Sequence, residues 1–232
     1  MVAFPNGDRR GMALPLMRNL VDTTGIAPLL KTHRIATSIV DFEAFHDDLA
    51  TNGANPILAR KIEDAVQTYF ARLELPDDAT LYDYLLLSLR EKDLIATFNW
   101  DPFLAQAYRR NAQGRKLPQI VLLHGNVEIG ACHDHMKKGF AFQTCSECAK
   151  PLAPSRLLYP VKQKDYNADA LIKSEWDTLR WFLKRVYMVT IFGYSAPTTD
   201  VEARKLMLEE WRSNPSVELA PIKSGPYFTV LN

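Results

Sequence analysis

The second half of the chain alternates short apolar runs with amphipathic segments of helical period. The apolar runs are DLIATFN, QIVLLHGN and YMVTIFGYS, and the helical segments are DPFLAQAYRRN, IKSEWDTLRWFLKRV and DVEARKLMLEEWRSN. Runs that are apolar throughout suit strands buried on both faces, which occur in parallel sheets connected by helices. The pattern predicts an α/β fold with a parallel sheet covered on both faces. The terminal segment PYFTVLN is a candidate last strand.

The first half of the chain is predicted to be mostly helical. LPLMRNLVDTTG indicates a short helix, with Pro15 in its first turn and Gly25 after its end. Residues 39–91 contain three further helical patterns, of which the first is capped by Asp41. We expect a helical insertion at 39–91 within a single domain that spans residues 1–232. His46 stands among the acidic residues of a solvated helix face and is assigned no role.

Charge and hydropathy exclude several classes of partner. Lys plus Arg number 28 and Asp plus Glu 27, a balance that argues against nucleic acid bound by bulk charge. We expect no membrane association, because no apolar run reaches the roughly 18 residues that span a bilayer. The first 20 residues show no charged leader followed by an apolar core, so a cytoplasmic location is expected. A protein partner or a homo-oligomer stays open.

Polar residues follow each predicted strand. Thr97, Asn99 and Asp101 end the first run, His124 and Gly125 the second, and Gly193 and Ser195 the third. Ligands bind outside the carboxyl ends of strands in such sheets, so these residues are candidates for a cleft. Each has a structural alternative. Asp101 before Pro102 suits a helix cap, His124 a buried hydrogen-bonded histidine, and Gly193 a tight turn.

Three cysteines lie close together in the sequence, in the loop CHDHMKKGFAFQTCSEC. Cys132, Cys145 and Cys148, with one histidine, supply the four ligands of a tetrahedral zinc site, and His135 is favoured over His133. We therefore expect a small zinc-binding module over residues 126–156. The alternative is that the three thiols are free.

The segments TFNWD, LHG, CSEC and FGYSAPTTD, in this order, resemble the sirtuin-like family of silent-information-regulator domains. The resemblance covers residues 94–207 and is greater to a divergent prokaryotic branch that includes NAD hydrolases of antiviral defence. It implies a Rossmann-like sheet with a helical insertion and a zinc module, and NAD as a nucleotide substrate. By position, Asn99 and Asp101 would lie at the nicotinamide pocket and His124 would be the general base. NAD contacts would come from four residues: Thr97, Gly193, Tyr194 and Ser195.

The residue types suit that chemistry. Cleavage of the nicotinamide–ribose bond develops positive charge on the ribose, as in glycoside hydrolysis. An amide can hold the leaving carboxamide, a carboxylate can stabilise the charge, and a histidine can activate a hydroxyl or water. Asn99, Asp101 and His124 supply these three groups.

The N-terminal loop departs from the family pattern. The family opens with a glycine-rich phosphate loop, and this chain has only NGDRRGMALPLM, in which no Gly-x-Gly occurs. Arg9 and Arg10 are candidate phosphate partners in its place, and a solvated loop is the alternative. Only one Cys-x-x-Cys pair is present where proper sirtuins carry two.

The leading hypothesis is an NAD hydrolase that transfers the ADP-ribose to water. Water is favoured as the acceptor because no feature for an acyl-lysine peptide is evident. A non-catalytic module that binds NAD, ADP-ribose or a partner protein is the second hypothesis, and a protein-lysine deacylase is the third.

Overall fold

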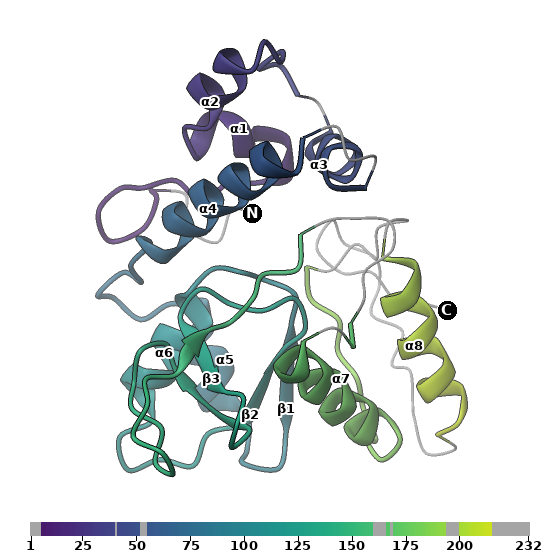
Figure 1. The fold of residues 1–232 in the computed structure, drawn as a ribbon. Helices are drawn as coiled ribbons and strands as arrows, with labels where there is room; N and C mark the ends of the chain where they lie inside the picture. Colours follow the sequence, from purple (N-terminus) through teal and green to yellow (C-terminus); the bar gives the residue numbers. More distant parts are fainter. Residues whose placement is uncertain are drawn as a thin grey trace.

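The computed structural model describes residues 6–39, 41–51, 55–159, 166–167, 169–193 and 200–214. Its elements, drawn in Figure 1, are a 3-10 helix at Met17–Asn19 and then α1 Leu20–Thr23, α2 Ala27–Thr32, α3 Phe42–Thr51, α4 Pro56–Ala71, α5 Leu81–Ser88, β1 Leu94–Thr97, α6 Phe103–Asn111, β2 Gln119–Leu122, β3 Ile129–Cys132, β4 Lys137–Phe140, β5 Ala153–Pro154, α7 Ala170–Leu183 and α8 Val201–Arg212. None of the helices in these ranges has the length and apolar character that a membrane crossing requires.

A parallel pair of strands, β1 and β2, lies between two layers of helices. The register places Leu94 opposite Gln119 and Thr97 opposite Leu122. Alternate residues point to opposite sides, so Ile120 packs with the core of α1–α6 while Val121 packs with α7 and α8. Figure 1 shows α7 and α8 on one side of the strands and α5 and α6 on the other. The predicted α/β class with a parallel sheet is confirmed.

The prediction of a third strand at YMVTIFGYS is wrong within the described residues. Residues 187–193 form no strand there, apart from a single bridge position at Met188. Tyr187, Met188 and Phe192 are all more than half exposed, and only Val189 and Ile191 pack against the core. The run is apolar in sequence, but its residues are partly buried or exposed, so it does not lie between two layers. Residues 194–199 and the candidate strand PYFTVLN fall outside the described residues.

The helices predicted at LPLMRNLVDTTG and within residues 39–91 form, and α2 is a further helix that lies outside these predictions. Side chains cap the first turns of α3 and α4. The amide of Ala44 donates to Asp41 at the start of α3. Asn55 accepts from the amide of Leu58 at the start of α4. α1 and α2, which precede residue 39, share a core with α3 and α4. The boundaries of an insertion at 39–91, and of one domain over 1–232, stay predictions.

A second sheet, the small antiparallel sheet, follows β2. Its three strands are antiparallel in the order β4, β3, β5, with Ala131 opposite both Lys138 and Ala153. The turn after β4 and the loop that leads to β5 carry the Cys-x-x-Cys pair. This sheet lies within residues 126–156, carries Cys132 at the end of β3, and supports the loop that contains Cys145 and Cys148.

Gly125 is a position where both the backbone conformation and the neighbouring backbone demand glycine. Its φ is +78°, and a Cβ there would collide with the carbonyl oxygen of Arg156. We expect Gly125→Ala to lower the free energy of unfolding by about 3 kcal/mol or more, from strain and collision together. Gly114→Ala is the matched control, because Gly114 has a φ of +69° and open space at its Cβ.

Urea denaturation of the two variants checks this expectation. The control is expected to lose about 1 kcal/mol, the cost of a left-handed conformation alone. Equal losses in the two variants would contradict the assigned collision.

Candidate functional site

The carboxyl ends of β1 and β2 are held side by side by main-chain and side-chain hydrogen bonds. The amide of Leu123 donates to the carbonyl of Thr97 over 2.9 Å. In the loops that follow the two strands, the amide of Val127 donates to the carbonyl of Trp100 over 3.1 Å. Asn126, which is buried, donates its side-chain amide to the carbonyl of Asp101 over 2.6 Å. The loop with Asn99 and Asp101 and the loop with His124 therefore lie at one edge of the sheet.

Asp101 is a buried carboxyl group that also caps α6. Its side chain is accessible to only 4% and accepts the amide of Phe103 over 3.1 Å. Burial raises the pKa of Asp101 to about 6, against the hydrogen bond from Phe103, which lowers it. The cap and a pKa near neutrality coexist in one residue, so the structural alternative does not exclude a role in a site.

Asp101→Asn tests the burial of this charge. Because the folded pKa of about 6 lies above the unfolded value of about 3.9, the folded state binds more protons between these pH values. The contribution of Asp101 to the stability of the wild type is therefore fully present below about pH 4 and is lost as the pH rises through 6. The variant keeps a cap and does not titrate. We expect it to gain about 3 kcal/mol relative to wild type between pH 3.5 and 7.5, measured by urea denaturation. A difference that stays constant with pH would contradict the raised pKa.

Asn99 is exposed beside Asp101, and its side chain forms a hydrogen bond with the Tyr82 hydroxyl. Burial raises the pKa of Tyr82, and the Asp101 carboxylate adds to this rise. The tyrosine therefore stays neutral and supplies a hydroxyl next to the amide. Sequence reasoning missed Tyr82 because it lies on α5, far from the strand ends in the chain.

His124 is buried, whereas a residue that faces a ligand cleft is expected to be more exposed. It is 7% exposed, and its Nε2 lies 3.4 Å from the Tyr166 hydroxyl. The ring of Phe98 meets it edge-on with centroids 4.7 Å apart, and Trp176 packs against both Phe98 and Tyr166. The aromatic rings fix the orientation of the imidazole. A hollow of about 380 Å³ among the described residues is lined by α8 alone, not by the strand ends.

Of the remaining predicted NAD contacts, the structure describes Thr97, Gly193, Arg9 and Arg10. Thr97 ends β1, and its hydroxyl accepts the amide of Asn99 over 3.1 Å. Gly193 is exposed with a φ of +68°, a turn conformation that suits glycine. Tyr194 and Ser195 lie outside the described residues.

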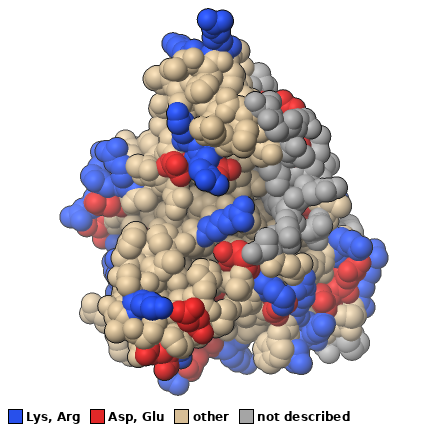
Figure 2. Space-filling model, in the orientation of Figure 1, with Lys and Arg blue, Asp and Glu red and all other residues tan. Residues whose placement is uncertain are grey.

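The two arginines of the N-terminal loop pair with acidic residues. Arg9 lies 3.0 Å from Asp77 and Arg10 lies 3.2 Å from Glu74, both in ion pairs at the surface. On the face in Figure 2, basic and acidic side chains lie next to each other rather than in separate patches. Pairing of this kind is typical of the solvated-loop alternative.

The same loop is closed around its own carboxylate. Asp8, which is buried, accepts the amides of Arg10 and Met12 over 2.8 Å each and the amide of Glu74 over 2.9 Å. Amides arranged in this way can bind a phosphate. Here an internal anion occupies them, so the loop does not offer these amides to a dinucleotide.

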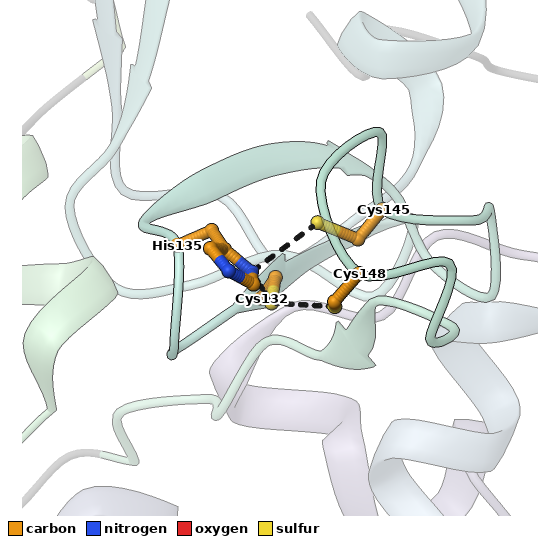
Figure 3. A group of neighbouring side chains, drawn as sticks. All are labelled: Cys132, His135, Cys145 and Cys148. Atoms are coloured by element: carbon orange, nitrogen blue, oxygen red, sulfur yellow. Dashed lines mark hydrogen bonds between the residues drawn. The ribbon is translucent and has the colours of Figure 1, made fainter.

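Cys132, His135, Cys145 and Cys148 converge in the small sheet (Figure 3). Their ligand atoms all lie within 4.8 Å of one another. Cys132 Sγ lies 3.7 Å from Cys148 Sγ and 3.4 Å from His135 Nδ1, and Cys145 Sγ lies 3.9 Å from the same nitrogen. A tetrahedral zinc site with bonds of about 2.3 Å to sulfur and 2.0 Å to nitrogen requires a sulfur–sulfur separation of about 3.8 Å and a sulfur–nitrogen separation of about 3.5 Å. The four residues fit a zinc ion.

The backbone around Cys145 favours its thiolate form. The amides of Glu147 and Cys148 point at its sulfur and lower the pKa of the thiol to about 7. Thiolates are the form that binds zinc. His133, the other histidine of the loop, is not part of the cluster, so the choice of His135 as a fourth ligand agrees with the geometry.

His46 was wrongly assigned to a solvated face. It is 1% exposed, its Nε2 lies 3.0 Å from Glu63, and its ring stacks on Tyr159 at 5.1 Å between centroids. Tyr159 packs in turn on Trp100, the residue between Asn99 and Asp101. The helical layer therefore contacts the loop after β1. The acidic neighbours of His46 in the sequence gave no signal of this burial.

No protein-family model matches the chain, and no curated protein matches it significantly. Similar solved structures include a Sir2 in complex with the inhibitor EX-527, 2'-O-acetyl-ADP-ribose and a deacetylated p53 peptide, at 18% identity and a TM-score of 0.39 over 92% of this chain and 74% of that chain. Another is Sir2Tm bound to a propionylated peptide, at 17% identity and a TM-score of 0.37 over 96% of this chain and 79% of that chain.

Proposed function

We propose that the chain consumes NAD, cleaving the nicotinamide–ribose bond with water as the acceptor. The observation that carries the proposal is the meeting of the β1 and β2 ends, where hydrogen bonds join the loop of Asn99 and Asp101 to the loop of His124. The loops that carry an amide, a carboxyl group and an imidazole therefore meet at the sheet edge where ligands of parallel sheets bind.

Each group has a role that follows from its environment. Asn99 is exposed, so its amide is accessible to a carboxamide. Asp101 has a pKa of about 6, so at pH 7 its carboxylate is mostly ionised and stabilises the positive charge that develops on the ribose. The imidazole of His124 would accept the proton of the attacking water. Its ring is held by Phe98 and Tyr166, which limits its motion.

Zinc would have a structural role in this protein. The cluster supplies four protein ligands, and closed sites of this kind leave no open position for a substrate. Bound zinc would fix the loop that joins β4 to β5, and the reacting groups are supplied by the β1 and β2 ends.

A second candidate function, binding without turnover, is favoured by a specific observation. The amides of the N-terminal loop are occupied by Asp8, and the two arginines beside it are paired with carboxylates. A nucleotide would then be held by fewer phosphate contacts. The chain would act as a binding or regulatory module.

Incubation of the purified protein with NAD separates these functions. We expect the protein to release nicotinamide and ADP-ribose from NAD when no acceptor other than water is present. Release that requires an acetyl-lysine peptide would instead assign a deacylase. Heat on calorimetric titration without any product would assign the binding module. Absence of both heat and product would contradict the proposal and its alternative together.

A further inference from the structure

The outer edge of β2 is held by one lysine and one glutamate. β2 pairs with β1 on one side, and within the described ranges no strand pairs with its other edge. Lys138 Nζ donates to the carbonyl of Ile120 over 2.8 Å, and the amide of Leu122 donates to Glu175 over 2.8 Å. The main-chain groups of an unpaired edge need partners, and here side chains supply them.

Lys138 and Glu175 also bind each other. Nζ lies 2.9 Å from each oxygen of the Glu175 carboxylate, so its three protons are all engaged. Glu175 is 4% exposed, and a carboxylate so deeply buried depends on its partner for charge compensation. The pair is therefore a fixed unit, unlike the ion pairs of long side chains at the surface.

One end of this unit belongs to the small sheet. Lys138 lies on β4 opposite Ala131 of β3, and the next residue of β3 is Cys132 of the metal-binding cluster. Metal binding orders the chain that carries the ligands. The position of Lys138 Nζ therefore depends on the order of the cluster.

The other end reaches the backbone just before His124. Glu175 holds the amide of Leu122, and the neighbouring Trp176 donates its indole N–H to the carbonyl of Leu123 over 3.0 Å. Two successive residues before His124 are thus fixed by α7. A displacement of Glu175 would be transmitted to the imidazole through one or two peptide units.

We infer that Lys138 and Glu175 are positioning residues that couple the occupation of the cysteine–histidine cluster to the placement of His124. The catalytic consequence rests on the proposed function, whereas the coupling itself does not. Zinc removal releases β4, Lys138 withdraws from Ile120 and Glu175, and the end of β2 loses its fixed position.

NMR spectroscopy of the full chain, loaded with zinc and after chelation, tests this coupling. The readouts are the ring signals of His124, the exchange rate of the Leu122 amide, and the zinc content. The test variant is the double substitution Lys138→Met with Glu175→Leu, which leaves no unpaired buried charge and removes the acceptor of the Leu122 amide. Lys137→Met is the matched control, because Lys137 is the neighbouring residue on β4 and pairs at the surface with Glu147.

In wild type and Lys137→Met, chelation is expected to shift the His124 signals and to speed exchange at Leu122 about tenfold. The double variant should bind one zinc per chain, exchange rapidly at Leu122 in both states, and show no shift of His124 on chelation. A response equal to wild type in the double variant, or no response in wild type, would overturn the inference. No NAD is present, so the result is independent of whether the chain cleaves it.

Discussion

Cys145→Ser is expected to abolish zinc binding and to lower the melting temperature by about 10 °C or more. Cys132 and Cys145 form a small buried cluster with Leu152, and Cys148 packs against it. An apolar core of this size is too small to keep the module folded without metal. Zinc contributes on the order of 10 kcal/mol to the folding of peptides with such ligand sets. A loss of about 3 kcal/mol in a domain of this size corresponds to the stated shift.

The loop contains its own control. His133→Ala and His135→Ala remove the same side chain two residues apart, and only His135 belongs to the cluster. By metal analysis and thermal denaturation, His135→Ala should lose zinc and melt early, as Cys145→Ser does. His133→Ala should keep the zinc content and melting temperature of wild type. If the two histidine variants bind equal amounts of zinc, the assigned ligand set is wrong.

His124→Ala is expected to lower kcat for nicotinamide release by about 100- to 10,000-fold, the range that general-base catalysis supplies. The imidazole follows the end of β2, and its ring is held in place by Phe98 and Tyr166. Histidine is the side chain that most often serves as a general base. Loss of a base acts on the chemical step, so KM should change much less than kcat.

Two comparisons separate this effect from a loss of folding. His33→Ala removes an imidazole at the end of α2 and should leave kcat unchanged. His124→Gln keeps a side chain of similar size with polar atoms and should retain the melting temperature of wild type while losing turnover. Full turnover in a folded His124 variant would remove the histidine from the mechanism.

Much of the fold follows from local patterns in the sequence. The cap Asp41 and the helical periods within residues 39–91 predict α3 and α4, because these signals depend on neighbouring residues. The apolar runs at Leu94 and Gln119 predict β1 and β2 for the same reason. The zinc cluster is predictable as well, since thiol ligands and their spacing are visible in the chain.

What the sequence could not supply is the pairing of distant side chains. The arginines of the N-terminal loop meet Glu74 and Asp77, and His46 meets Glu63, across intervals that carry no periodic signal. Tyr187 to Gly193 is as apolar as β1 in composition, but three of its large residues face outward. Burial of a run is decided by the neighbouring layers, which local composition does not encode.

The account depends on a nucleotide binding where β1 and β2 end. A crystal structure of the protein with ADP-ribose, at a concentration that saturates the calorimetric signal, tests this claim most directly. The account predicts density for the ribose beside Asn99 and on the side of the sheet edge that carries His124. Density along α8, or at any place remote from Thr97 and His124, would contradict it.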